Sequence, residues 1–315
     1  MIIKHADDKT KRLNLLTELT KSDRLDARQR QWAEDELVRT KRGIEGERDA
    51  AYYIDSYFKD SKNHAVLHDL RIEVDGDIAQ IDHLLLNRSN RLFLFETKCF
   101  NGNLQINEHG EFTMNYSGGR VFGIPSPIEQ SKRHERVLQK VLDRLEITGR
   151  TGKPEFVHAV LLHPKAVIAR PDSKDFNSDN VIKADAIETW HKRWIDKEIG
   201  IAGTFSALLN VRSTDTVQQW AEKLARQHRP VDLLALPDFM KPKVHEVPTA
   251  RLQPVTTTPA KAVDSKQPDE ALRRKLICVT CGSKITFPEG KYCWANERRF
   301  GGFQYCREHQ SQFQQ

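Results

Sequence analysis

Two short apolar runs on either side of a four-residue turn are the feature that most restricts how this chain can fold. Residues 77–87 (DIAQIDHLLLN) and 91–100 (RLFLFETKCF) flank the turn residues Asn87–Asn90. Apolar runs of this length around a cluster of Asn and Ser are typical of a β-hairpin. If the two strands pair across this turn, Asp82 lies opposite or nearly opposite Glu96.

The predicted hairpin concentrates charge on one face. Glu96 and Lys98 are two positions apart, so their side chains point to the same side of a strand. Two facing carboxylates destabilise a sheet unless a cation lies between them. That cation can be Lys98, a divalent metal ion or both, and carboxylate oxygens suit Mg²⁺ or Mn²⁺. The simpler alternative is an ordinary sheet that carries a Glu96–Lys98 salt bridge.

A third carboxylate, Glu47, comes from a predicted helix over residues 43–58. Glu47 falls on the apolar stripe of this helix, which consists of Ile44, Ala51, Ile54 and Phe58. A carboxylate that faces a core is costly unless it is paired or bound to a metal, although the helix dipole also favours an acidic residue near a helix start. The coincidence of Glu47 with the hairpin residues favours a site in which a metal beside a lysine polarises a phosphodiester and lowers the pKa of an attacking water.

Four sequence blocks in order resemble the nuclease-related domain (NERD), a family placed in the PD-(D/E)xK phosphodiesterase superfamily. The blocks are Gly43–Glu47 (GIEGE), Ile81–His83 (IDH), Phe95–Lys98 (FETK) and Pro125–Pro127 (PSP) followed by Gln130. The resemblance covers about residues 40–190. The chain lacks the Pro-Asp pair of the superfamily name, since Ile81 precedes Asp82.

The resemblance implies a restriction-endonuclease-like α/β fold, with a mixed sheet of about four strands flanked by helices. It implies that Asp82 and Glu96 bind the catalytic metal and that Glu47 contacts it directly or through water. Lys98 would be the catalytic lysine, and Gln130 would orient water or substrate. His83 points away from Asp82 on a regular strand, so we expect it in the core, whereas His134, one turn after Gln130, could reach a phosphate.

The rest of the chain is predicted from local patterns. Ser126 is a good N-cap for a helix over 126–145, with Pro127 at its first position and Glu129 completing a capping box. The sequence predicts one or two surface helices in 1–42, strands at 64–74, 156–164 and 180–187, short strands within 101–125, and helices at 188–197 and 214–228. The predicted domains are an N-terminal helical segment (1–42), a NERD-type domain (43–238), a flexible Pro-rich linker (239–275) and a zinc-binding module (276–315).

The C-terminal cysteines have the spacing of a metal site. Cys278-Val-Thr-Cys281 is followed by Gly282, and Cys306-Arg-Glu-His309 comes later. Three thiolates and one imidazole at this spacing predict a closed, structural Zn²⁺ site, without which so short a module could not fold. Cys293 is expected to be a buried thiol, and the module resembles small zinc-ribbon or treble-clef tails of nucleic-acid enzymes.

The excess positive charge lies towards the C-terminus. Residues 1–240 contain 37 Lys and Arg and 37 Asp and Glu, whereas residues 271–315 contain 8 and 3. Basic residues interleaved with aromatics fit phosphate contact and base stacking. The basic residues are Arg273, Arg274, Lys275, Lys284, Lys291, Arg298, Arg299 and Arg307. Most of the aromatics are expected in a mini-core, and Trp294 is the one expected to be exposed. A solvated basic tail without a partner is the simpler alternative.

These features together predict a metal-dependent nuclease that acts on DNA and docks it with a zinc tail. The alternatives are an inactive nucleic-acid-binding or adaptor protein and a module whose zinc tail recruits a protein partner. The five cysteines do not suggest disulfides, and no apolar run of about 18 residues or signal-type segment occurs in the sequence. We therefore expect no membrane association and a reducing, cytoplasmic compartment.

Overall fold

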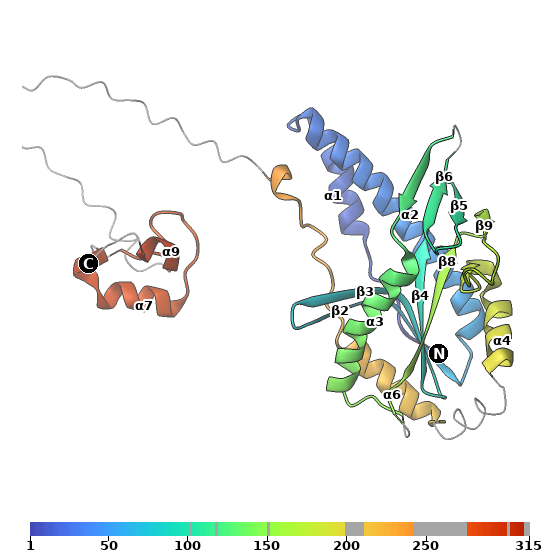
Figure 1. The fold of residues 1–315 in the computed structure, drawn as a ribbon. Coiled ribbons are helices and arrows are strands. Elements are labelled where there is room, and N and C mark those ends of the chain that lie inside the picture. Colours follow the sequence, from blue (N-terminus) through green and yellow to red (C-terminus); the bar gives the residue numbers. More distant parts are fainter. Residues whose placement is uncertain are drawn as a thin grey trace, which may run out of the picture. The chain divides into compact units, whose positions relative to one another are not determined.

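A computed structural model describes residues 1–100, 102–116, 119–149, 152–198, 211–241, 276–300 and 303–311. The chain divides into two compact units, Met1–Val244 and His245–Gln315. The first unit contains a mixed six-stranded sheet flanked by helices, which confirms the predicted mixed α/β class (Figure 1).

The main sheet has the strand order β1-β2-β3-β4-β8-β10. β2, β3 and β4 are antiparallel neighbours, whereas β1 runs parallel to β2, and β8 runs parallel to both β4 and β10. The strands are β1 (Ile2–Lys4), β2 (His64–Val74), β3 (Asp77–Asn87), β4 (Arg91–Lys98), β8 (Glu155–Leu162) and β10 (Val181–Lys183). The sheet is wider than the resemblance implied, because the N-terminal strand β1 and strand β10 extend its two edges.

Helices cover both faces of this sheet (Figure 1). α3 (Pro127–Arg144) and α6 (Thr214–Ala225) share one core with Leu92 and Leu94 of β4. α2 (Ala27–Phe58) and α4 (Ile187–Glu198) share the other core with Phe93 and Phe95. A strand buried on both faces needs apolar residues at every position, which explains the continuous run at 92–95.

A second, smaller sheet lies beyond β8, with the strand order β7-β6-β5-β9. These strands are β5 (Asn103–Ile106), β6 (Phe112–Asn115), β7 (Val121–Ile124) and β9 (Ile168–Ala169). Leu104, Phe112 and Met114 pack against Val160 and Leu162 of β8 in a third core. The predicted short strands of 101–125 thus form a layer of their own.

The predicted hairpin between β3 and β4 forms with the predicted register. Leu84 pairs with Leu94, and His83 pairs with Phe95. Continuing this register by one residue places Asp82 opposite Glu96, at the end of the regular pairing.

β2 and β3 share an irregularity next to Asp82. Their regular pairing passes from His68↔His83 to Leu70↔Ile81 and skips Asp69 and Asp82 between them. Asp69 has φ +54°, a left-handed conformation that Asp tolerates better than most residues. The alternation of core-facing side chains shifts by one residue at this point in both strands, so Asp69 and Asp82 occupy opposite positions where the alternation breaks.

Several predicted boundaries were wrong. The helix expected at 43–58 begins at Ala27, because Asp26 and Gln29 form a capping box and no Gly or Pro follows until Gly43. It therefore runs through position 42, and α1 (Thr10–Thr20) precedes it. Its buried stripe is Gly46, Ala50, Ile54 and Phe58, with Ile44 and Ala51 only partly buried.

Other local predictions need smaller corrections. Ser126 Oγ accepts the backbone N–H of Glu129, as predicted, but the Glu129 carboxylate lies 2.8 Å from Lys132 Nζ instead of completing the capping box. The strand expected at 180–187 ends at Lys183, where a 3₁₀ turn (Ala184–Ala186) leads into α4. A 3₁₀ turn at Asp238–Met240 overlaps the start of the predicted linker (239–275), and residues 242–275 lie outside the described part of the chain.

The described part of the second unit contains three short helices, α7 (Phe287–Ala295), α8 (Glu297–Phe300) and α9 (Arg307–Gln310), and a β-bridge between Ile277 and Lys284. None of the helices in the described parts of either unit combines the length and the apolar character needed to cross a bilayer.

Candidate active site and metal centre

A close approach between α2 and β4 brings Glu47 to the acidic cluster. Gly46 packs against Cys99, which follows β4, and a Cβ atom added to Gly46 would lie only 2.8 Å from Cys99 Cβ. Cys99 is partly buried in this contact. A glycine is therefore required at position 46 for α2 to pass the end of β4 at this distance. The next residue, Glu47, consequently lies near the end of β4.

Glu96, Lys98 and Gln130 form a connected set across β4 and α3. Lys98 Nζ lies 2.7 Å from Glu96 Oε1 and donates a hydrogen bond of 3.1 Å to Gln130 Oε1. His134 Nδ1, one turn further along α3, lies 3.7 Å from Glu96 Oε2. Burial, with Lys98 and Arg133, lowers the pKa of His134 to about 4, so this imidazole is neutral near pH 7.

Asp82 lies beside this set, on the neighbouring strand. Its Oδ2 accepts the backbone N–H of Thr97 at 2.7 Å, whereas its Oδ1 has no hydrogen-bond partner among the described residues. Burial and the charges of Glu96 and Glu47 raise the pKa of Asp82 well above its usual range. Burial, with a contribution from Glu47, also raises the pKa of Glu96, although Lys98 opposes this shift. The three carboxylates therefore repel one another.

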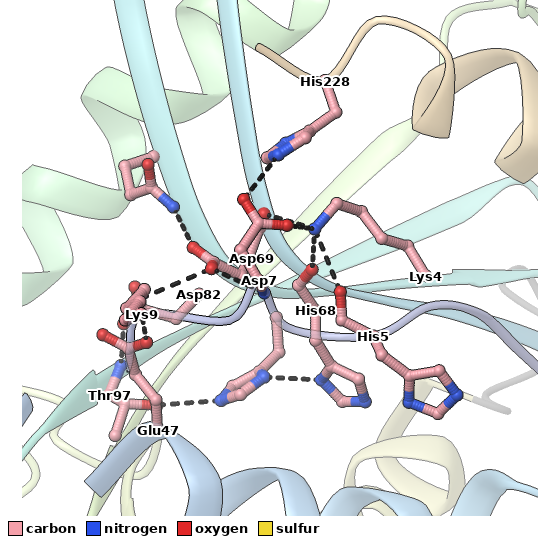
Figure 2. A network of polar contacts seen from close by, with 12 residues as sticks. Lys4, His5, Asp7, Lys9, Glu47, His68, Asp69, Asp82, Thr97 and His228 are labelled. Carbon is pink, nitrogen blue, oxygen red and sulfur yellow. Dashed lines mark hydrogen bonds and ion pairs between the residues drawn. The ribbon is translucent and has the colours of Figure 1, made fainter. Parts of the chain in front are cut away.

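Two site residues were missed from the sequence. Lys9 Nζ lies 2.7 Å from Glu47 Oε2 and 3.4 Å from Asp69 Oδ2 (Figure 2). Asp69 is buried, and it also accepts hydrogen bonds from the Asp7 backbone and the Gln80 side-chain amide. Asp69 could have been found from the sequence, because it is a carboxylate within the apolar strand 64–74. Nothing in the sequence near Lys9 indicated that it pairs with Glu47.

A chain of buried hydrogen bonds supports the site from the α2 face. His68 Nε2 lies 2.9 Å from Asp55 Oδ1. The Nδ1 atoms of His68 and His83 are 2.7 Å apart, and His83 Nε2 lies 3.1 Å from Thr97 Oγ1. Figure 2 shows His68 and Thr97 connected through the imidazole between them. Burial lowers the pKa of both imidazoles, so both are neutral.

The protonation states of the two histidines follow from Asp55, the acceptor at one end of this series of hydrogen bonds. The Asp55 carboxylate can only accept, so His68 donates from Nε2 and accepts at Nδ1 from His83. His83 Nε2 then accepts a hydrogen bond from the Thr97 hydroxyl group. His83 is buried as predicted, and it holds Thr97, whose backbone N–H in turn holds Asp82.

Residues 42–164 match the family model of the nuclease-related domain. This chain carries a nuclease-related domain. The matched residues of the NERD domain include Glu47, Asp82, Glu96, Lys98 and Gln130, whereas Lys9 and α4 lie outside it. No curated protein and no solved structure gives a significant match to the chain.

The carboxylate oxygens of the NERD domain lie further from one another than the donor atoms of a preformed metal site. Among the described residues, the set whose donor atoms all lie within 4.8 Å of one another is the C-terminal Cys/His set. In the acidic cluster, Lys9 and Lys98 act as counter-cations for Glu47 and Glu96. The free Oδ1 of Asp82 between two further carboxylates nevertheless has the donor chemistry that Mg²⁺ or Mn²⁺ requires.

The predicted zinc ligands Cys278, Cys281, Cys306 and His309 come together in the second unit. Cys281 Sγ lies 3.9 Å from Cys306 Sγ, and His309 Nδ1 lies 3.6 Å from Cys278 Sγ and 3.0 Å from Cys306 Sγ. A tetrahedral zinc with Zn–S bonds of about 2.3 Å separates its sulfur ligands by about 3.8 Å. The donors therefore fit a structural Zn²⁺ ion.

The backbone around these cysteines has the form of a zinc knuckle. Gly282 has φ +69° and donates its N–H to Cys278 O at 2.8 Å, which turns the chain after Cys281. Cys293 lies outside the ligand set and is fully buried, where it accepts hydrogen bonds from the Tyr305 backbone and the Gln310 amide.

Proposed function

We propose that this protein is a metal-dependent nuclease that hydrolyses phosphodiester bonds in DNA. The observation that carries the proposal is the position of Lys98, whose ammonium contacts both Glu96 and Gln130 beside the partly buried Asp82. A cation among repelling carboxylates, within a nuclease-related domain, supports phosphodiester chemistry more than a structural role.

Asp82 and Glu96 would hold a Mg²⁺ or Mn²⁺ ion, with Glu47 contacting it directly or through water. When bound, such an ion polarises the phosphodiester and lowers the pKa of the attacking water. The ion would compete with Lys9 for Glu47, because the Glu47 carboxylate oxygen Oε2 is already paired with Lys9.

The residues of the chain itself would orient the reactants. The Lys98 ammonium has three N–H donors, of which two are directed to Glu96 and Gln130, so a third is free for an oxygen of the phosphate that gains charge. Gln130 accepts from Lys98 through Oε1, which leaves its NH₂ group to donate to a phosphate oxygen or to the attacking water.

We propose that the zinc module helps to dock DNA. Its basic side chains Arg299 and Arg307 line a hollow with Tyr292, which is 46% exposed. Trp294, the aromatic expected to be exposed, is 39% exposed, and Phe287 is 61% exposed. Lys275, predicted to join this surface, lies outside the described residues.

An adaptor without catalysis is the second candidate. The observation that favours it is the pairing of Glu47 and Glu96 with lysines, which satisfies both carboxylates without a metal. In that case the zinc module would recruit a protein partner.

Nicking of a supercoiled plasmid with Mg²⁺ or Mn²⁺ tests the proposed activity. The wild-type chain should nick the plasmid, and EDTA or the substitutions Glu96→Gln and Lys98→Ala should prevent nicking. Lys132→Ala is a matched control, because Lys132 is an exposed lysine on α3 that pairs with Glu129. Nicking by Glu96→Gln at the wild-type rate would exclude the assigned site.

A further inference from the structure

A cavity of about 370 Å³ lies beside α4, outside the matched residues of the nuclease-related domain. Its walls come from α4, from β10 and from the segment that precedes β10. Its charged and indole lining residues are Arg170, Asp179, Trp190, Arg193, Trp194 and Lys197. A volume of this size is within the range of small-ligand sites, and none of the proposed catalytic residues lines it.

One face of α4 supplies both the aromatic and the basic lining. Trp190, Arg193, Trp194 and Lys197 stand at positions i, i+3, i+4 and i+7, so they form a single stripe along the helix. The stripe alternates between indole rings and cations. This pattern differs from an ordinary amphipathic helix, in which apolar and charged residues occupy opposite faces.

The two indole rings are held in place by the protein. Trp190 is 7% exposed, and its Nε1 donates to Asn180 Oδ1 at 3.2 Å. Trp194 is half-buried, with the Phe93 ring 5.0 Å away and the Arg91 guanidinium 5.3 Å from its ring centroid. Fixed rings at a cavity wall lose little conformational entropy when a flat ligand packs against them.

The cations of the cavity fall into two groups. Arg170 is committed to the fold, because it donates to Ser178 O, Ser178 Oγ and Val181 O, and Asp179 acts on it electrostatically. Arg193 and Lys197 are exposed, and neither forms an ion pair with another described residue. By contrast, Lys192 on the same helix pairs with Glu188 at 2.6 Å.

We propose that this cavity binds a nucleobase together with its phosphate, as part of a single-stranded nucleic-acid segment. The base would stack against the indole of Trp194 or Trp190, and Arg193 and Lys197 would contact the flanking phosphates. Base–aromatic stacking beside a cationic rim is the usual mode of single-strand binding. The lining residues account for the binding of a base and a phosphate. That these belong to a nucleic-acid strand rests on the proposed nuclease function.

The test measures binding separately from catalysis. The full-length Glu96→Gln chain, in EDTA, is titrated into a fluorescein-labelled oligothymidine, and the anisotropy is followed at several salt concentrations. Arg193→Gln with Lys197→Gln should weaken binding at least tenfold and reduce the salt slope by about 1.4, because each lost phosphate contact on a single strand removes about 0.7. Lys192→Gln is the matched control and should bind like the parent chain.

Competition experiments identify the ligand. Thymidine 5′-monophosphate should displace the oligonucleotide weakly, and deoxyribose 5-phosphate, which lacks a base, should not displace it. Trp194→Leu should weaken binding at a temperature where this variant is fully folded, and the double cation variant should keep the parent thermal unfolding temperature. Unchanged affinity and salt slope in the double variant would overturn the proposal, as would equal competition by deoxyribose 5-phosphate.

Two further outcomes separate the strand source from the nuclease function. If the mononucleotide binds as tightly as the oligonucleotide, the cavity is a free-nucleotide site and the strand assignment fails. If the wild-type chain never nicks plasmid but the oligonucleotide still binds through Arg193 and Lys197, the nuclease proposal fails while the binding site stands.

Discussion

The ammonium of Lys9 lies 2.7 Å from the carboxylate of Glu47, although the two residues are 38 positions apart in the chain. Lys9 also lies 3.4 Å from Asp69 Oδ2, so one cation from the N-terminal segment neutralises two carboxylates. Glu47 and Asp69 raise the pKa of Lys9, although burial opposes this shift. The N-terminal segment is therefore part of the acidic site and not a separate appendage.

Replacing Lys9 by Met should destabilise the chain and increase its response to metal. Removal of the ammonium leaves the partly buried Glu47 and the buried Asp69 without this ion-pair partner, which should lower the free energy of unfolding by about 1–3 kcal/mol. Added Mg²⁺ should restore part of this loss, so the metal-induced rise in melting temperature should be larger than in the wild type. Lys11→Met, at an exposed position, is the control. Equal metal-induced shifts in both variants would show that Lys9 and the metal do not compete.

Substitutions in the cluster should separate activity from stability. Asp82→Asn, Glu96→Gln and Lys98→Ala should each reduce metal-dependent cleavage at least about 100-fold. The two carboxylate substitutions should not lower the melting temperature, because each removes a buried charge that its neighbours repel. Plasmid nicking and thermal unfolding are measured on the same preparations. A large fall in melting temperature would instead indicate that the carboxylates are structural.

The purified chain should contain about one tightly bound zinc ion. Cys278→Ser and His309→Ala should lose the zinc, whereas Cys293→Ser should keep it, because the Cys293 thiol is outside the ligand set. Metal analysis of dialysed protein gives the zinc content. Zinc lost from Cys293→Ser but kept in His309→Ala would mean that the fourth ligand is wrongly assigned.

The buried His191 and the partly buried His64 should make the first unit sensitive to acid. Burial, with His191 and the N-terminal ammonium, lowers the pKa of His64 to about 3, and burial lowers the pKa of His191 to about 4. Unfolded imidazoles titrate near pH 6.5, so the unfolded state takes up protons first as the pH falls. Stability should therefore be complete above about pH 6.5 and should fall below it by up to about 1.4 kcal/mol per pH unit for each histidine.

His191→Phe provides the test of this pH dependence. The substitution removes one titrating ring and a buried Nε2 that has no hydrogen-bond partner among the described residues. Between about pH 6.5 and 5, the loss of unfolding free energy in urea should be smaller by about 2 kcal/mol than in the wild type. His109→Gln, at an exposed position, should leave the wild-type pH dependence intact. The same slope in His191→Phe would refute the assignment.

Truncation after Val244, the end of the first unit, should weaken DNA binding and flatten its salt dependence. Residues 1–240 have no net charge, and their acidic cluster repels phosphate. Each lost phosphate contact on duplex DNA should reduce the salt slope by about 0.9. The truncated chain should still cleave at low salt and high concentration. Unchanged affinity and salt slope would favour a protein partner for the zinc module.

The sequence by itself determined the parts of this protein that depend on short-range geometry. The turn at Asn87–Asn90 and the two-residue period of a strand were enough to place Asp82 opposite Glu96 and to put Lys98 on the same face. The Cys-x-x-Cys and Cys-x-x-His spacings were likewise enough to identify the four donors that gather in the second unit. In both cases the relevant contacts lie within one hairpin or one small module.

Only the tertiary structure decided which distant residues complete the site. The start of α2 at Ala27, the Gly46–Cys99 contact and the Lys9–Glu47 ion pair all join segments that no local pattern connects. Such contacts depend on how helices and strands pack against one another, and the same local sequence is compatible with many packings. The Asp69 irregularity is similar, since the carboxylate of this residue with positive φ is bound by Lys9 and Gln80, which come from two other segments of the chain.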